Sequence, residues 1–253
     1  MEIQPSQKLE AAKRGDYEVT SSDWISQGWD FFKNNAGLMI GYVFMVFGIA
    51  MVAQFIPFLG PLAQAFVISP ALAFGFYLYA YQYDRKGQAD FNTFFDGFQH
   101  LGRLVPVILL QMLVIMGAMI PFGIVMSISL DVFGGMEDPN FVFFGLAMIP
   151  LVAVAFYLGL SWMFAYPMAV FFDLGPWEAM EASRKAVTQQ FWYWVGFALL
   201  LMVVSMAGAF ALGIGLLVAY PVILYAQYAA FRDMTNLLAG ETAQDDILEH
   251  LVG

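Results

Sequence analysis

The chain of 253 residues is far more apolar than a soluble domain. Hydrophobic residues make up 61% of it and charged residues only 12%, whereas a soluble domain holds about 25% charged residues. The mean hydropathy is +0.71. The absence of cysteine excludes a disulfide scaffold, and together with the presence of only two histidines it argues against a zinc site. The formal charge of −10 argues against binding to nucleic acid. This is the composition of an integral membrane protein.

Four long stretches without charged residues or histidine predict the membrane spans. They are 34–83, 104–130, 139–172 and 189–231. Because one span needs about 20 apolar residues, the first and last stretches hold two spans each. Pro57-Phe58-Leu59-Gly60-Pro61 is expected to turn the first pair. The candidates for the turn of the last pair are Gly208, Gly213 and Gly215, and Pro150 or Pro167 is expected to bend the long fourth span. The six predicted spans are 37–57, 61–83, 103–129, 142–172, 192–211 and 213–232.

The positions of the basic residues predict the orientation of these spans. With six spans, all ten Lys and Arg lie on one side of the membrane, while the loop 131–140 on the other side has three acids and no base. The positive-inside rule then places both termini in the cytoplasm. Residues 1–36 contain no apolar signal-peptide core, so the first span is expected to act as an uncleaved signal anchor.

A short amphipathic helix is predicted before each pair of spans, starting near Ser22, Asp90 and Pro176. The pattern indicates an all-α fold in which one unit, a cytoplasmic amphipathic helix plus a transmembrane hairpin, occurs three times. The expected units are 21–83, 90–172 and 176–232, within one membrane domain of 21–233. Residues 1–20 are expected to be a cytoplasmic N-terminal tail and 234–253 an acidic cytoplasmic C-terminal tail.

The amphipathic helices carry the best functional lead, because their aromatic residues suit the headgroup region of a bilayer. Two interpretations stay open: a collar that holds the bundle against the inner leaflet, and a docking surface for a partner membrane protein. The predicted interfacial anchors are Trp24, Trp29, Phe94, Phe95, Phe98 and Trp177.

Proline recurs in the second helix of each hairpin. Pro70 follows Ser69, and the sequence Ala-Tyr-Pro occurs twice, ending at Pro167 and Pro221. These prolines either bend the helices for compact packing or free backbone carbonyls that line a cavity, with Tyr166 and Tyr220 on its wall.

Small residues four apart predict close helix packing. One such seam pairs Ala71 with Gly75, and a second runs through Ala207, Ala211 and Gly215.

The sequence predicts no catalytic, cofactor-binding or metal-binding residue. The predicted spans hold no ionisable group away from their ends, which argues against an ion-coupled transporter. Glu178 is expected at a helix start and Glu181 in an ion pair with Lys185, four residues on. Neither His100 nor Ser183 has partners at the spacing of a metal site or of an activated nucleophile.

Several short motifs carry a family resemblance: the Phe-rich segment 91–98, the segments 177–185 and 190–192, and Tyr228-Ala229-Ala230-Phe231-Arg232-Asp233. In these the chain resembles the YciC-like bacterial inner-membrane proteins, a family of undefined function, and the membrane domain attached to some glycerophosphodiester phosphodiesterases. The resemblance implies a six-helix protein of the bacterial inner membrane. The phosphodiesterase catalytic domain itself has no room in this chain.

The expected function is that of a non-enzymatic inner-membrane protein that organises lipid or scaffolds partner membrane proteins. The alternative is a transporter or exporter of a neutral or amphiphilic molecule, through a cavity between the bent helices. The expected partners are membrane lipid and, for a scaffold, another membrane protein. The sequence predicts no oligomeric state.

Overall fold

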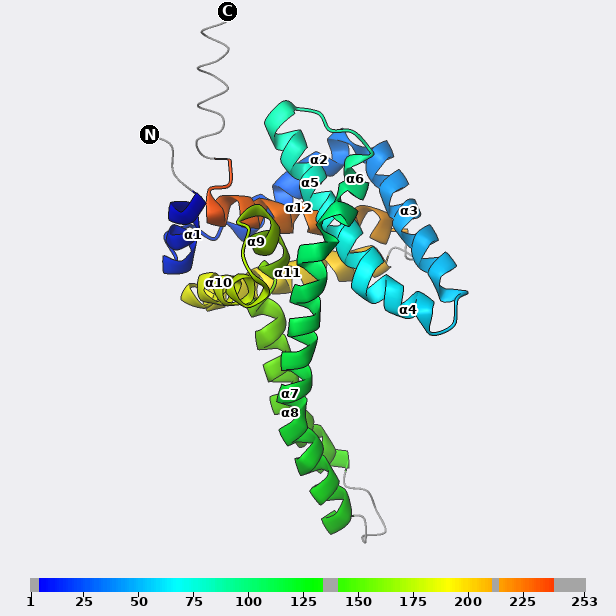
Figure 1. Cartoon of the computed structure of the whole chain (residues 1–253), viewed down its shortest axis with the longest axis vertical. Coiled ribbons are helices and arrows are strands. Elements are labelled where there is room, and N and C mark those ends of the chain that lie inside the picture. Colours follow the sequence, from blue (N-terminus) through cyan, green and yellow to red (C-terminus); the bar gives the residue numbers. More distant parts are fainter. Residues whose placement is uncertain (1–4, 134–140, 211–213, 239–253) are drawn as a thin grey trace, which may run out of the picture.

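The computed structural model describes residues 5–133, 141–210 and 214–238, and the regular elements in this part of the chain are all helices (Figure 1). The first hairpin and the segments before it comprise α1 (Pro5–Arg14), α2 (Ser21–Asn34), α3 (Ala36–Gln54), α4 (Leu59–Ala63), the π-helical turn η1 (Gln64–Ile68) and α5 (Ser69–Lys86). The remaining elements are α6 (Thr93–Asp96), the 3₁₀ turn η2 (Gly97–His100), α7 (Leu101–Phe133), α8 (Phe141–Ser161), α9 (Ala165–Phe171), α10 (Pro176–Gln189), α11 (Phe191–Phe210) and α12 (Leu216–Thr235).

Five segments of the described chain are long and apolar enough to cross a membrane, which identifies a multi-pass membrane protein. They are Ala36–Gln54, Leu59–Lys86, Thr93–Ile124, Met148–Phe171 and Phe191–Phe210. Helix α12, which covers most of the expected sixth span, is not among them. It is largely buried, and its C-terminal half includes the charged pair Arg232 and Asp233. Of the three glycines expected at the last turn, Gly208 lies inside α11, Gly215 directly precedes α12, and Gly213 lies outside the described residues.

The buried core lies at one end of the molecule. We call this part the head: it consists of α1, α2, α6, α9, α10 and the adjoining ends of α5, α11 and α12. Its largest side chains are aromatic and almost completely buried, and they include Trp24, Phe31, Tyr79, Phe94, Phe164, Trp194 and Phe231. Many of these rings touch one another; the Trp24 and Trp194 rings, for example, stack at 5.5 Å. The head is therefore held together by ring packing contributed from almost every part of the chain.

The hairpins extend from the head with apolar surfaces facing outward. In Figure 1 the α7–α8 hairpin runs along the long axis, and the α3–α4 hairpin extends in another direction. Large apolar side chains are exposed on each of them, among them Phe44, Leu113 and Ile149, and Phe210 is exposed at the end of α11. Only 11% of the most apolar window of Thr93–Ile124 is buried. A surface of this kind is stable only where hydrocarbon covers it, as lipid does in a bilayer.

The Ala71–Gly75 seam packs as closely as predicted, but against α6 and η2 rather than against another long helix. A Cβ added to Gly75 would lie 1.9 Å from the Phe94 carbonyl oxygen, and one added to Gly97 would lie 1.9 Å from the Ala71 carbonyl oxygen. The backbones of α5 and of the α6–η2 segment are thus in direct contact. In the second seam, Ala211 lies outside the described residues.

Three prolines that the sequence singles out have different structural consequences. Pro70 is the second residue of α5, which follows the π-helical turn η1, and Pro167 lies in the first turn of α9, after a break in the helix at 162–164. Pro221 lies inside α12, which continues through it. Pro150 likewise lies inside α8 without ending it. The expected fourth span is therefore broken just before Pro167 and not at Pro150.

The expected turn of the first hairpin is confirmed, since α3 ends at Gln54 and α4 begins at Leu59. Phe58 has φ 60° and ψ −52°, and the Leu59 N–H donates to the Pro57 carbonyl at 2.7 Å. These values describe a γ-turn of the rare, strained class. A proline-rich turn therefore reverses the chain within a few residues.

Two predicted boundaries need correction. The expected N-terminal tail contains α1, which packs against α10 and α12 with Ala12 completely buried. Lys8 donates from its Nζ to the Leu237 carbonyl at 3.0 Å, at the end of α12. The second amphipathic helix begins at Thr93 rather than near Asp90, because residues 91–92 form a turn.

Candidate functional site

An open cleft lies between α7 and α8 where the hairpin leaves the head. Its volume is about 530 Å³, within the range of about 300–1,000 Å³ that is usual for sites of small ligands. Most of the lining is apolar, including Ile115 and Met119 from α7 and Leu151, Val154 and Leu158 from α8. The walls therefore suit a hydrocarbon chain.

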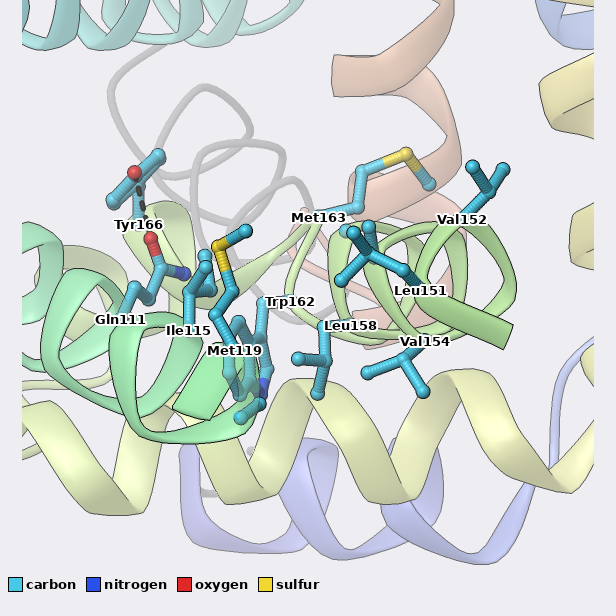
Figure 2. Close-up of a pocket in the computed structure, with 13 residues that line it drawn as sticks. Gln111, Ile115, Met119, Leu151, Val152, Val154, Leu158, Trp162, Met163 and Tyr166 are labelled. Carbon is cyan, nitrogen blue, oxygen red and sulfur yellow. Dashed lines mark hydrogen bonds between the residues drawn. The ribbon is translucent and has the colours of Figure 1, made fainter. Parts of the chain in front are cut away.

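One end of the cleft is polar. The Tyr166 hydroxyl donates to the Gln111 side-chain oxygen at 2.8 Å, and Figure 2 shows this pair at one end of the row of apolar side chains. Both groups are uncharged. Trp162 and Met163 also line the cleft. The arrangement resembles a site for a molecule with a long apolar part and a small polar part.

The break between α8 and α9 forms one boundary of the cleft, and Ser183 of α10 stabilises it. The Ala165 N–H bonds to Trp162 instead of to Ser161, at 3.0 Å. The freed Ser161 carbonyl accepts the Ser183 hydroxyl at 2.7 Å, and the same hydroxyl oxygen accepts the Phe164 N–H at 3.2 Å. Ser183, which the sequence leaves without a role, thus satisfies two buried backbone groups.

The expected cavity with both Tyr166 and Tyr220 on its wall needs correction. Tyr166 lines the α7–α8 cleft, but the ring of Tyr220 stacks at 6.5 Å on Tyr42 of α3. Pro70 and Pro221 also lie away from the cleft, which draws its lining from α7, α8 and α9 and the residues between the last two. The reason is that the hairpins diverge, so Tyr166 and Tyr220, which share a local sequence, lie in different surroundings.

A second hollow, of about 640 Å³, lies between α3 and the α4–η1 segment. Its described lining consists of apolar residues, among them Met45, Ile49 and Ile68. Because this hollow lacks a polar end such as the Gln111–Tyr166 pair, it offers no means to select among apolar ligands.

The six predicted interfacial anchors divide into two groups. Trp29, Phe95 and Trp177 are exposed, so they are free to contact headgroups. Trp24 and Phe94 are completely buried in the head, which corrects their assignment, and Phe98 is partly buried. Trp24 packs against Trp194 and also donates from its ring nitrogen to Asp233 at 2.8 Å. One face of each amphipathic helix is covered by protein, and periodicity alone cannot separate that face from a lipid-facing one.

A polar cluster missed by the sequence analysis joins α2, α5 and α12. Arg232 pairs with Asp84 at 2.6 Å and with Asp233 at 2.8 Å, and it donates to the Gln27 side chain at 2.8 Å. Tyr225 donates to Asp84 at 2.6 Å. The side chains of Arg232 and Asp84 are only 18% and 10% exposed. One sequence feature could have indicated this cluster: Asp84 and Arg232 both lie at the ends of predicted spans.

The N-terminal segment is anchored by Tyr17, which lies outside the apolar helices. Its hydroxyl donates to the Ala186 carbonyl at 2.7 Å and accepts the Trp194 ring N–H at 2.8 Å. Burial raises the pKa of Tyr17 to about 12, although the hydrogen bond from Trp194 acts in the opposite direction. Tyr17 therefore stays neutral and hydrogen-bonded at ordinary pH.

The charged residues of α10 do what the sequence predicts. The Gly175 N–H donates to Glu178 at 3.2 Å, and Glu181 pairs with Lys185 at 3.4 Å and with Arg184 at 2.7 Å. The hydrogen bond from Arg184 lowers the pKa of Glu181.

Among the described residues, no group of three or more His, Cys, Asp or Glu is placed to hold a metal ion.

Comparison with protein families, curated proteins and solved structures finds no match to this chain.

Proposed function

We propose that this chain is a non-enzymatic protein of the bacterial inner membrane that binds and organises lipid, with the α7–α8 cleft as its ligand site. The observation that carries the proposal is the combination of apolar walls with the Gln111–Tyr166 pair at one end. An acyl chain along Leu158 and Met119 would leave a headgroup or linkage within reach of that pair. Because the acyl chain already lies in hydrocarbon rather than in water, the affinity would come from van der Waals packing in the cleft and from hydrogen bonds at its polar end.

The same proposal includes a topology with six spans and both termini in the cytoplasm. Helix α12 would complete the third hairpin, and the head would be cytoplasmic. This is supported by the location of the basic residues in the head or at the helix ends beside it, such as Arg103, Arg184 and Arg232. Trp192 and Tyr193 at the start of α11 are exposed, as expected of an aromatic belt at the interface. The threefold repeat and the membership of the YciC-like family belong to this proposal.

The scaffold interpretation receives less support than the lipid interpretation. Burial of Trp24 and Phe94 leaves Trp29, Phe95 and Trp177 as the predicted anchors that a partner or the membrane surface would meet.

A second candidate function is the export or transfer of an amphiphile through the same cleft. The break at 162–164 beside the cleft favours it, because transporters often place interrupted helices at their binding sites. Flux of a labelled lipid across vesicles that contain the protein distinguishes the two functions. A binding protein leaves that flux at the background rate, whereas an exporter raises it.

Two glycines allow a matched test of the cleft. Gly159 lines the cleft, and a Cβ added there would meet nothing within 4 Å; Gly117 on α7 is equally open but does not line the cleft. We expect Gly159→Phe to fill the cleft and to reduce the lipid that native mass spectrometry finds on the purified protein. Gly117→Phe should retain the wild-type amount. Equal retention by both variants would overturn the proposal.

A further inference from the structure

The polar end of the α7–α8 cleft offers both a donor and an acceptor to a ligand. The Tyr166 hydroxyl gives its proton to the Gln111 side-chain oxygen, so the Tyr166 oxygen can still accept a hydrogen bond and the Gln111 amide nitrogen can still donate. Neither of these two atoms has another partner among the described residues. Figure 2 shows the amide nitrogen of Gln111 directed away from Tyr166 and towards Ile115 of the apolar wall. The pair therefore fits a polar group that both donates and accepts.

This pair lies within the apolar part of the helices rather than at their charged ends. Arg103 near the start of α7 pairs with Asp173, which follows α9. Gln111 comes eight residues after Arg103, about 12 Å along an α-helix, and lies near the middle of the apolar segment Thr93–Ile124. The described residues that line the cleft are all uncharged. A phosphate or ammonium group beside Gln111 would lose its hydration without gaining an opposite charge, which is costly.

We infer that the cleft selects an uncharged lipid whose polar end carries a hydroxyl group, such as a diacylglycerol. The inference rests on the proposed function of the cleft and specifies the chemical class of its ligand. The ligand hydroxyl donates to the Tyr166 oxygen and accepts from the Gln111 amide, while an acyl chain lies along the apolar wall. A phospholipid matches this pair less well, because its charged phosphate stays nearer to the ends of the helices.

The Gln111–Tyr166 pair governs which lipid binds more than how much lipid binds. Bilayer hydrocarbon surrounds every acyl chain, so the apolar walls discriminate little between lipids that carry the same chains. A ligand without a matching donor and acceptor, by contrast, leaves the polar atoms of the pair unsatisfied, and this penalises the wrong ligand. Removal of either side chain should therefore reduce the preference for a hydroxyl-bearing lipid while lipid in general is still retained.

The test uses the full chain in phosphatidylcholine nanodiscs that contain equal small amounts of three probes with the same acyl chains. The probes are diacylglycerol, its acetyl ester, which lacks the hydroxyl proton, and phosphatidylglycerol, which is charged. Native mass spectrometry counts each probe retained on the released protein. The variants are Tyr166→Phe and Gln111→Leu. The matched control is Tyr220→Phe, because Tyr220 has the same Ala-Tyr-Pro sequence but stacks on Tyr42 away from the cleft.

We expect the wild type to retain diacylglycerol over each of the other probes by about three- to tenfold, as a neutral hydrogen bond provides. Tyr166→Phe and Gln111→Leu should reduce this preference, and Tyr220→Phe should keep it. Melting temperatures equal to that of the wild type establish that the variants are folded.

The inference is overturned if the wild type does not prefer diacylglycerol to both other probes, or if Tyr166→Phe and Gln111→Leu keep the preference as fully as Tyr220→Phe does. Either result leaves the proposed function standing. Failure of the proposed function has a separate signature, equal retention of total lipid by Gly159→Phe and Gly117→Phe.

Discussion

At the scale of single residues, Ser183 shows how a buried hydroxyl can support a broken helix. It satisfies the Ser161 carbonyl and the Phe164 N–H and is itself completely buried. We expect Ser183→Ala to destabilise the protein by about 1–3 kcal/mol, since both backbone groups lose their partner. Thermal unfolding in detergent measures the change. Ser205→Ala serves as the control, because the Ser205 hydroxyl donates to the Leu201 carbonyl of its own helix. A loss as large as that of Ser183→Ala would contradict the role of Ser183.

Tyr17 makes the stability of the head depend on pH at alkaline values. Its pKa is about 12 in the folded chain, against about 10 in an unfolded chain. Because the folded pKa is the higher one, the stabilising contribution is complete below pH 10 and is lost as the pH rises towards 12. The stability difference between the wild type and Tyr17→Phe should therefore shrink over this range. A constant difference across it would show that Tyr17 does not titrate as described.

At the scale of helices, the contact between α5 and α6 leaves no room for a side chain at Gly75. A methyl group there would lie 1.9 Å from the Phe94 carbonyl oxygen. We expect Gly75→Ala to destabilise by about 1–3 kcal/mol through overpacking. Gly41→Ala, at a position with open space, should be neutral or stabilising by about 0.5–1 kcal/mol. Similar melting temperatures for the two variants would contradict the close approach.

The Arg232 cluster ties α12 to α2 and α5. Asp84→Ala would remove one of the two carboxylates that pair with a largely buried guanidinium. We expect a loss near the lower end of the range of about 3–5 kcal/mol that is typical of broken buried pairs, because Asp233 still pairs with Arg232. Asp30→Ala, which breaks the exposed pair with Lys33, should cost at most about 1 kcal/mol. A smaller loss for Asp84→Ala than for Asp30→Ala would rule out the role of Asp84.

The sequence predicted most helices because long charge-free stretches and helix-start signals are local properties. It located the turn at 57–61, the seam at Ala71 and Gly75, and the ion pair of Glu181 with Lys185. It did not predict that Trp24 and Phe94 are buried. An apolar face at helical spacing looks the same whether lipid or protein covers it.

The cleft was only partly accessible to sequence reasoning. Tyr166 lines the α7–α8 cleft, while Tyr220 packs on Tyr42, so the expected cavity between the proline-containing helices with both tyrosines on its wall is not the cleft of the structure. The two tyrosines share the same local sequence, but their surroundings depend on the angles between hairpins, which no local pattern encodes. The partner of Tyr166, Gln111, lies 55 residues away in the chain, so their hydrogen bond required the fold.

At the scale of the whole molecule, the proposed topology can be tested directly because the chain has no cysteine. We expect Gln88→Cys, in the exposed turn after α5, to react with a membrane-impermeant maleimide only in opened cells. Asn140→Cys, in the loop expected on the opposite side, should react in intact cells. The reverse pattern would show that the orientation is inverted.

The most direct test of the central claim is an experimental structure of the protein in lipid nanodiscs, determined by cryo-electron microscopy with a bound fiducial. The account predicts that α7 and α8 stay apart, with elongated lipid density between Leu158 and Met119 and its polar end beside Gln111 and Tyr166. If α7 and α8 instead close on each other and the cleft side chains pack together without ligand density, the α7–α8 cleft is not a lipid site.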